Sequence, residues 1–104
     1  MVKEIYDADF KEEVLDYEGI VFVEFFATWC PHCKALAPVL ESVSDEVWKV
    51  KFVKVDIDKN PQASVTYDVE SIPTLKIFKS GEVINSNDGF LPKEQLINFI
   101  SESV

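Results

Sequence analysis

The sequence predicts a small α/β protein with a mixed central sheet of about five strands, flanked by about four helices. Residues 20–27 form an apolar run interrupted only by Glu24, and apolar residues at helical spacing follow it. Such a run is typical of a central strand buried on both faces, which favours parallel neighbours covered by helices. The 104 residues suit one domain, residues 1–104, with one core.

The first helix is expected to begin at Asp7, a residue type that suits an N-cap, and to end at Gly19. Within it, Phe10, Val14 and Tyr17 recur on one stripe. The stripe predicts that these three side chains face the core.

A longer helix is expected after the apolar run. Its apolar stripe consists of Leu36, Leu40, Val43 and Val47. Pro38 lies inside this pattern, and we expect it to kink the helix rather than end it.

The second half of the chain alternates strand and helix signals. Residues 51–57 favour a further strand, and Asn60 with Pro61 marks a helix start. Residues 74–78 and 82–84 flank a Ser-Gly pair and predict a hairpin. A last helix is expected near Pro92, and its buried side chains are Leu96, Phe99 and Ile100.

The charge of the chain excludes one class of partner. The formal net charge is −9, and all ten basic residues are lysines. A nucleic-acid binder needs a basic face, so we expect no nucleic-acid partner. The charged first twenty residues do not resemble a signal peptide, and no apolar run is long enough to span a bilayer. We therefore expect a cytoplasmic monomer that does not contact a membrane.

The chain has only two cysteines, Cys30 and Cys33. A bond between them closes a very short loop and adds little stability, whereas a disulfide scaffold carries more cysteines along the chain. Chemistry is therefore the better explanation. A strand-to-helix junction places Cys30 at a helix N-terminus, which favours the thiolate that attacks disulfides. Cys33, one turn on and more buried, is expected to resolve the mixed disulfide.

The same pair of cysteines has other interpretations. It could form half of a zinc or iron–sulfur site, but the only histidine is His32 and there is no second cysteine pair. One chain therefore supplies too few ligands, which leaves a metal shared across a dimer. An inert disulfide is the other alternative.

Taken together, the motifs resemble those of the thioredoxin family along the whole chain. The matching segments are residues 23–27, 29–34 with both cysteines, Pro38, residues 56–61, 71–75 and 78–82, and Gly89. The resemblance implies a thioredoxin fold and a redox-active Cys30–Cys33 disulfide, with no bound cofactor and no metal. It also implies disulfide-containing protein substrates, an NADPH-dependent thioredoxin reductase as partner, and a role in electron transport and cell redox homeostasis.

The dipeptide between the cysteines departs from the family pattern. Pro31–His32 replaces the usual Gly-Pro and resembles the dipeptide of the oxidant DsbA. A hydrogen bond or partial positive charge from His32 would stabilise the Cys30 thiolate and hence the reduced protein. We therefore expect a potential on the order of −200 to −240 mV, between the reference values of about −270 mV for thioredoxin and about −120 mV for DsbA. Alternatively, His32 is an exposed residue without electrostatic effect, and Pro31 simply suits a first helical turn.

Glu24 is the second departure, because the family carries a buried aspartate in this strand. Burial raises the pKa of a carboxyl group, which suits proton transfer to and from Cys33. The resemblance places Glu24 beneath the dithiol and Lys54 as its partner. The alternatives are that Glu24 reaches solvent at a sheet edge and that Lys54 is only a solvated side chain.

A third group of residues is expected to bind substrate. Ile72–Pro73 resembles the family's cis-proline turn, which leaves the backbone of Ile72 free to pair with an extended segment. Trp29, Ile72 and Gly89 would then form a largely apolar docking surface around Cys30. In isolation, Trp29 would more often be a packing residue.

These observations favour a protein-disulfide reductase that works through Cys30 and Cys33. The same chemistry would serve a disulfide oxidase or isomerase, since the partner that recharges the pair sets the direction of flow. A non-catalytic binding module is a third hypothesis, because fold alone does not dictate function.

Overall fold

The computed structural model describes all 104 residues, and five strands form one mixed sheet in the order β1-β3-β2-β4-β5. The strands are β1 (Lys3–Glu4), β2 (Ile20–Phe26), β3 (Lys51–Asp56), β4 (Thr74–Lys79) and β5 (Glu82–Asp88). β2 is parallel to β3 and antiparallel to β4. The predicted central position of β2 is therefore confirmed, but parallel pairing on both sides is wrong. An apolar run reports that both faces are covered and not how the strand is paired.

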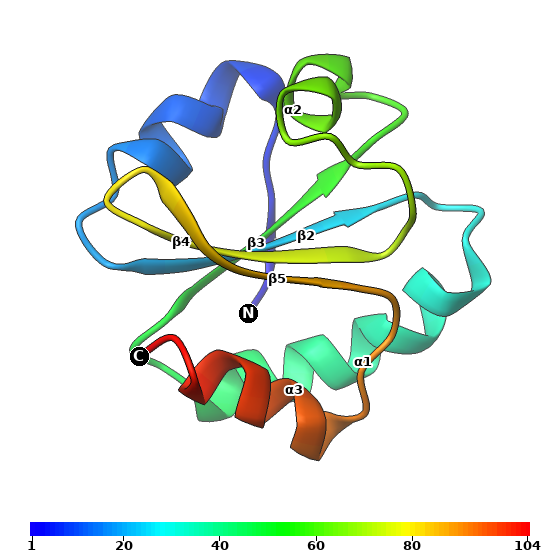
Figure 1. Ribbon diagram of the computed structural model, residues 1–104. Helices are drawn as coiled ribbons and strands as arrows, with labels where there is room; N and C mark the ends of the chain where they lie inside the picture. Colours follow the sequence, from blue (N-terminus) through cyan, green and yellow to red (C-terminus); the bar gives the residue numbers. More distant parts are fainter.

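Helices cover both faces of the sheet. They are α1 (Pro31–Glu46), α2 (Pro61–Thr66) and α3 (Lys93–Ser101), preceded by the 3₁₀ turn η1 (Asp7–Asp9) and the π-helical turn η2 (Lys11–Leu15). Figure 1 shows α1 and α3 on one face and α2 with the N-terminal turns on the other. The mixed sheet between two helical layers confirms the predicted fold class. None of the helices is both long and apolar enough to span a bilayer.

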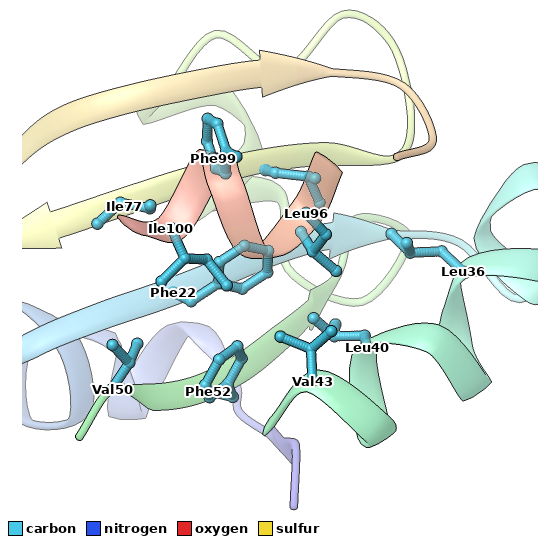
Figure 2. Packing of buried hydrophobic residues seen from close by; sticks show 11 residues of the cluster. Phe22, Leu36, Leu40, Val43, Val50, Phe52, Ile77, Leu96, Phe99 and Ile100 are labelled. Carbon is cyan, nitrogen blue, oxygen red and sulfur yellow. The ribbon is translucent and has the colours of Figure 1, made fainter. Parts of the chain in front are cut away.

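The larger of the two main apolar clusters lies between the sheet and the α1–α3 layer (Figure 2). Its members are Phe22, Leu36, Leu40, Val43, Val50, Phe52, Leu75, Ile77, Leu96, Phe99 and Ile100. The stripes predicted for α1 and α3 supply most of it, although Val47 is only half-buried. α1 continues through Pro38, as expected. The second cluster, on the other face, contains Val21, Val23 and Phe25 of β2.

Asp7 caps a helix, but not the one expected. Its carboxylate accepts hydrogen bonds from the N–H groups of Gln62 and Ala63 at 3.0 and 2.9 Å. These N–H groups belong to the first turn of α2 and have no partner within that helix. The N-terminal turns end at Leu15, with Asp16 as their cap, so the expected helix boundary at Gly19 is also wrong. A cap residue shows only that some helix begins nearby.

Tyr17 does not join the core. Phe10 and Val14 are buried, but Tyr17 is 40% exposed and its ring lies 4.5 Å from Lys51 Nζ. The reason is that a 3₁₀ turn followed by a π-helical turn does not keep the period of 3.6 residues on which the predicted stripe rests.

The hairpin is confirmed. Ser80 and Gly81 have φ angles of +53° and +80°, the conformation of a type I′ turn between antiparallel strands. β5 runs on to Asp88, further than the predicted end at residue 84. β1 was not identified from the sequence because its two residues are too few to show a pattern.

Candidate active site

The two cysteines lie where β2 leads into α1. Cys30 is the N-cap of α1, and its Sγ accepts a hydrogen bond from the N–H of Cys33 at 3.2 Å. Pro31 follows at the first helical position. The sulfur of Cys30 therefore occupies the place where free N–H groups and the helix dipole favour negative charge.

Both thiols are free and buried, with 3% of Cys30 and 4% of Cys33 exposed. The expectation that Cys33 is the more buried of the two is not confirmed, because both side chains are almost fully buried. The sulfur of Cys30 turns inward to the amide of Cys33, and its thiol faces the carbonyl of Ile72 at 3.8 Å. A segment far away in the sequence covers Cys30, and that cover is invisible to local reasoning.

The two sulfurs nevertheless differ in their chemistry. Burial, and next the contact with the Cys30 thiol, raise the pKa of Cys33 to about 12. Cys33 therefore holds its proton at neutral pH. It becomes a nucleophile only when a neighbouring group accepts that proton.

Glu24 lies in the middle of β2 and is 3% exposed. Burial raises its pKa to about 7, an effect that Lys54 partly opposes. Glu24, Cys33 and Lys54 line one pocket of about 210 Å³. Since β2 is the middle strand of the sheet, the alternative that Glu24 reaches solvent at an edge is excluded. The structure thus brings a carboxyl group that titrates near neutral pH to the same pocket as the protonated thiol.

Lys54 lies opposite Glu24 in the β2–β3 register. No ion pair joins the two residues, and Lys54 Nζ lies 5.2 Å from the ring centroid of Phe26. Lys54 therefore acts on Glu24 through its field and not through the direct pair that the resemblance implied.

His32 is exposed in the first turn of α1, as is Pro31. No hydrogen bond joins its imidazole to Cys30, whose thiol and sulfur are engaged by Ile72 and Cys33. An effect of His32 on the potential remains a prediction.

A loop from the other side of the sheet completes the site. The Ile72–Pro73 peptide bond is cis, and the N–H of Gly89 donates to the carbonyl oxygen of Pro73 at 2.7 Å. With the contact between Cys30 and Ile72, these bonds bring Gly89 and the cis-proline turn to the reactive thiol. Gly89 has a φ of +101°, a conformation that favours glycine.

Trp29 lies on the surface beside Cys30. It is 62% exposed, and its Nε1 donates to Asp58 Oδ2 at 2.8 Å. The alternative that Trp29 packs in the core is therefore wrong. The hydrogen bond fixes an exposed indole at the rim of the site.

Two aspartates near the site received no role from the sequence. Asp58 accepts a hydrogen bond from Trp29, and Asp88 Oδ1 lies 3.4 Å from Thr74 Oγ1, whose hydroxyl donates to the carbonyl oxygen of Ser71. Asp58 belongs to one of the matching motifs, so a signal for it existed. Asp88 reaches the site only through the pairing of β5 with β4, and the sequence carries no signal for it.

The chain contains no group of three or more His, Cys, Asp and Glu side chains arranged to hold a metal ion. One chain therefore offers only the two thiols, which is fewer than a four-ligand zinc site requires.

The amino-acid sequence is similar to those of known proteins. The family model described as thioredoxin matches residues 1–102. The chain belongs to the thioredoxin family. It is 47% identical over 105 residues to a thioredoxin of Listeria monocytogenes, with 100% of both chains covered. A thioredoxin of Rickettsia typhi is 41% identical with the same coverage, and one of Rhodospirillum rubrum is 42% identical over 99% of this chain and 100% of the relative.

Membership of the thioredoxin family gives the site its chemistry. The chain is a thiol–disulfide oxidoreductase that reduces protein disulfides through Cys30 and Cys33. Like other thioredoxins, it needs no bound cofactor. Its substrates are disulfides, and the general partner of the family is a thioredoxin reductase.

Proposed function

We propose that this chain is a cytoplasmic protein-disulfide reductase that carries electrons from an NADPH-dependent thioredoxin reductase to protein substrates and so maintains redox homeostasis. The observation that supports this best is the asymmetry of the dithiol. Cys30 caps a helix next to the exposed Trp29, whereas Cys33 shares a pocket with a carboxyl group of raised pKa. The sulfur of Cys30 is placed to attack a substrate, whereas the sulfur of Cys33 stays protonated until a base accepts its proton.

In the first step, the Cys30 thiolate attacks one sulfur of the substrate disulfide. A bond forms between Cys30 Sγ and that sulfur, the substrate S–S bond breaks, and the leaving thiolate takes a proton from solvent. Trp29, Ile72, the cis-bonded Pro73 and Gly89 surround Cys30, and we assign them to substrate binding. The free backbone of Ile72 would pair with an extended substrate segment.

In the second step, Glu24 accepts the proton of Cys33 within the pocket that both side chains line. The Cys33 thiolate then attacks Cys30 Sγ, so the Cys30–Cys33 disulfide forms, and the second substrate thiolate leaves with the proton that Glu24 returns. The substrate has gained two electrons and two protons. Lys54 tunes the carboxyl group because its charge favours the ionised form of Glu24.

The direct test uses single cysteine variants with a disulfide-bonded model protein as substrate. Cys33→Ser should accumulate a covalent mixed disulfide with the substrate, detectable by mass spectrometry, and Cys30→Ser should form none. Trapping through Cys33, or unchanged turnover by either variant, would contradict the assigned order of attack. Retained physiological activity of a double Cys→Ser variant would support the binding-module hypothesis instead. Stoichiometric metal in the purified dimer would support the shared metal site.

The potential sets the equilibrium of the Cys30–Cys33 pair, so we would equilibrate the wild type and His32→Gly with glutathione. We expect the wild type on the order of −200 to −240 mV, and the variant nearer the thioredoxin reference of about −270 mV. Equal potentials for the two proteins would mean that exposed His32 has no electrostatic effect. A wild-type potential in the expected range would also make the oxidase or isomerase role worth testing.

A further inference from the structure

Two acidic side chains are attached to the two segments that flank Cys30. Asp58 accepts a hydrogen bond from Trp29, the residue before Cys30, and Asp88 pairs in the β4–β5 register with Thr74, the residue after Pro73. Figure 1 shows the loop after β2, the segment leading into β4 and the end of β5 at one end of the sheet. The docking surface expected to be largely apolar therefore carries two carboxylates.

These carboxylates are not neutralised by the protein itself. Asp58 and Asp88 are exposed, and neither takes part in an ion pair. Lys59 follows Asp58 in the chain without pairing with it, and Lys76 of β4 bonds to Ser86 instead. The net charge of −9 adds to the negative field around the site.

The sheet register brings Asp88 close to the reactive end. Thr74 and Asp88 are directly opposed in the β4–β5 pairing, and the next residue, Gly89, bonds to the carbonyl of Pro73. An extended substrate segment advances about 3.3 Å per residue, so residues two or three from its reacting cysteine lie about 7 to 10 Å away from that cysteine. Cys30 contacts Ile72, Pro73 is bonded to Gly89, and Asp88 precedes Gly89, so a long cationic side chain at such a position would extend toward Asp88.

We propose that Asp58 and Asp88 make this site selective for disulfides whose reacting cysteine is flanked by lysine or arginine. The inference rests on the proposed reductase function and adds a substrate class to it. Opposite charges across an interface speed encounter and fix register, whereas like charges oppose binding. Segments with flanking glutamate or aspartate are therefore disfavoured.

The test uses three synthetic peptides, each with one cysteine in a disulfide with the same small thiol. The residues two positions before and after the cysteine are lysine, glutamine or glutamate. The second-order rate constant for reduction of each peptide is measured for the reduced wild type, Asp58→Asn, Asp88→Asn and the double variant. Asparagine at position 58 can still accept the hydrogen bond from Trp29. Glu102→Gln is the matched control, since it removes one exposed charge from the end of α3.

The wild type should reduce the lysine peptide about 3- to 10-fold faster than the glutamate peptide at low salt, because each exposed pair contributes up to about fivefold. Each Asp→Asn change should lower this ratio about twofold or more, and high salt should compress it. The lysine and glutamate rates are divided by the glutamine rate of the same protein, which removes any general effect of a substitution on the site, and the control should keep the wild-type ratio. Equal rates for lysine and glutamate peptides, or a ratio that survives the double variant, would overturn the selectivity but leave the reductase function intact. Failure to reduce any peptide would overturn the proposed function itself.

Discussion

Phe22 and Glu24 lie two residues apart on one face of β2, and both are almost fully buried. The ring of Phe22 packs against Phe52 and Phe99, with centroids 5.3 and 6.4 Å apart. Glu24 instead lines a pocket with Cys33, and its burial disfavours its charge. Burial of the ring stabilises the fold, whereas burial of the carboxyl group opposes it. The comparison teaches that the apolar part of the strand carries the stability that the reactive part lacks.

The largest expected effect lies at the apolar position. Phe22→Ala should lower the free energy of unfolding by about 3–5 kcal/mol, because it removes buried contacts and leaves a cavity. Urea unfolding at fixed pH measures this loss, and Phe22→Leu should lose less. The folded fraction of the variant should still reduce disulfides at the wild-type rate. A loss below about 1 kcal/mol would mean that Phe22 does not carry the stability assigned to it.

The next effect concerns the stability cost of Glu24. Its pKa is raised from 4.5 in the unfolded chain to about 7 in the folded protein, so the folded state holds the proton more tightly. The stability of wild type relative to Glu24→Gln is therefore highest below pH 4.5, falls between pH 4.5 and 7, and is constant above. The fall should approach about 3 kcal/mol, at roughly 1.36 kcal/mol per unit of pKa.

Unfolding free energies measured from pH 4 to 8 give that difference directly. Glu12→Gln, which alters an exposed carboxyl group, should show no comparable trend. If the difference between wild type and Glu24→Gln were independent of pH, the carboxyl group would not be the source of the cost.

The Glu24→Gln substitution also tests whether the buried carboxyl group accepts the proton of Cys33. Glu24→Gln should slow the second step, in which Cys33 releases the substrate, by about tenfold or more, since a positioned base contributes at least that much. Attack by Cys30 should keep its rate. Stopped-flow mixing that resolves the mixed disulfide separates the two steps. Equal slowing of both steps, or of neither, would remove Glu24 from proton transfer.

The smallest effect belongs to Lys54, which faces Glu24 without an ion pair. Lys54→Gln should raise the pKa of Glu24 further, since Lys54 opposes the effect of burial. The pH-dependent loss of stability should therefore extend to higher pH than in the wild type. Lys79→Gln, an exposed change on β4, should leave the curve in place. A curve unchanged by Lys54→Gln would mean that the field of Lys54 does not reach the carboxyl group.

Patterns within one segment were predictable from the sequence. The burial of β2, the stripes of α1 and α3 and the turn at Ser80–Gly81 each follow from neighbouring residues and fixed periods. The placement of Cys30 at the start of α1 followed in the same way. The cis bond before Pro73 came only from the family resemblance.

Features that depend on distant segments were not predictable. The carboxylate of Asp7 caps a helix more than fifty residues away, and the position of Ile72 beside Cys30 came only from the family resemblance. Asp88 likewise reaches the site only through the pairing of β5 with β4. Sequence periodicity describes which face of a segment is buried, but not which segment covers it.

The hydrogen bonds that Asp7 accepts from α2 also affect the order in which contacts form during synthesis. Its partners lie 55 and 56 residues further along the chain, and β1 likewise pairs only with β3. At about 5 to 20 residues per second, the N-terminal segment leaves the ribosome roughly 3 to 10 s before the residues that it will hold. During synthesis, β1 and Asp7 therefore remain without these partners until β3 and the first turn of α2 have been made.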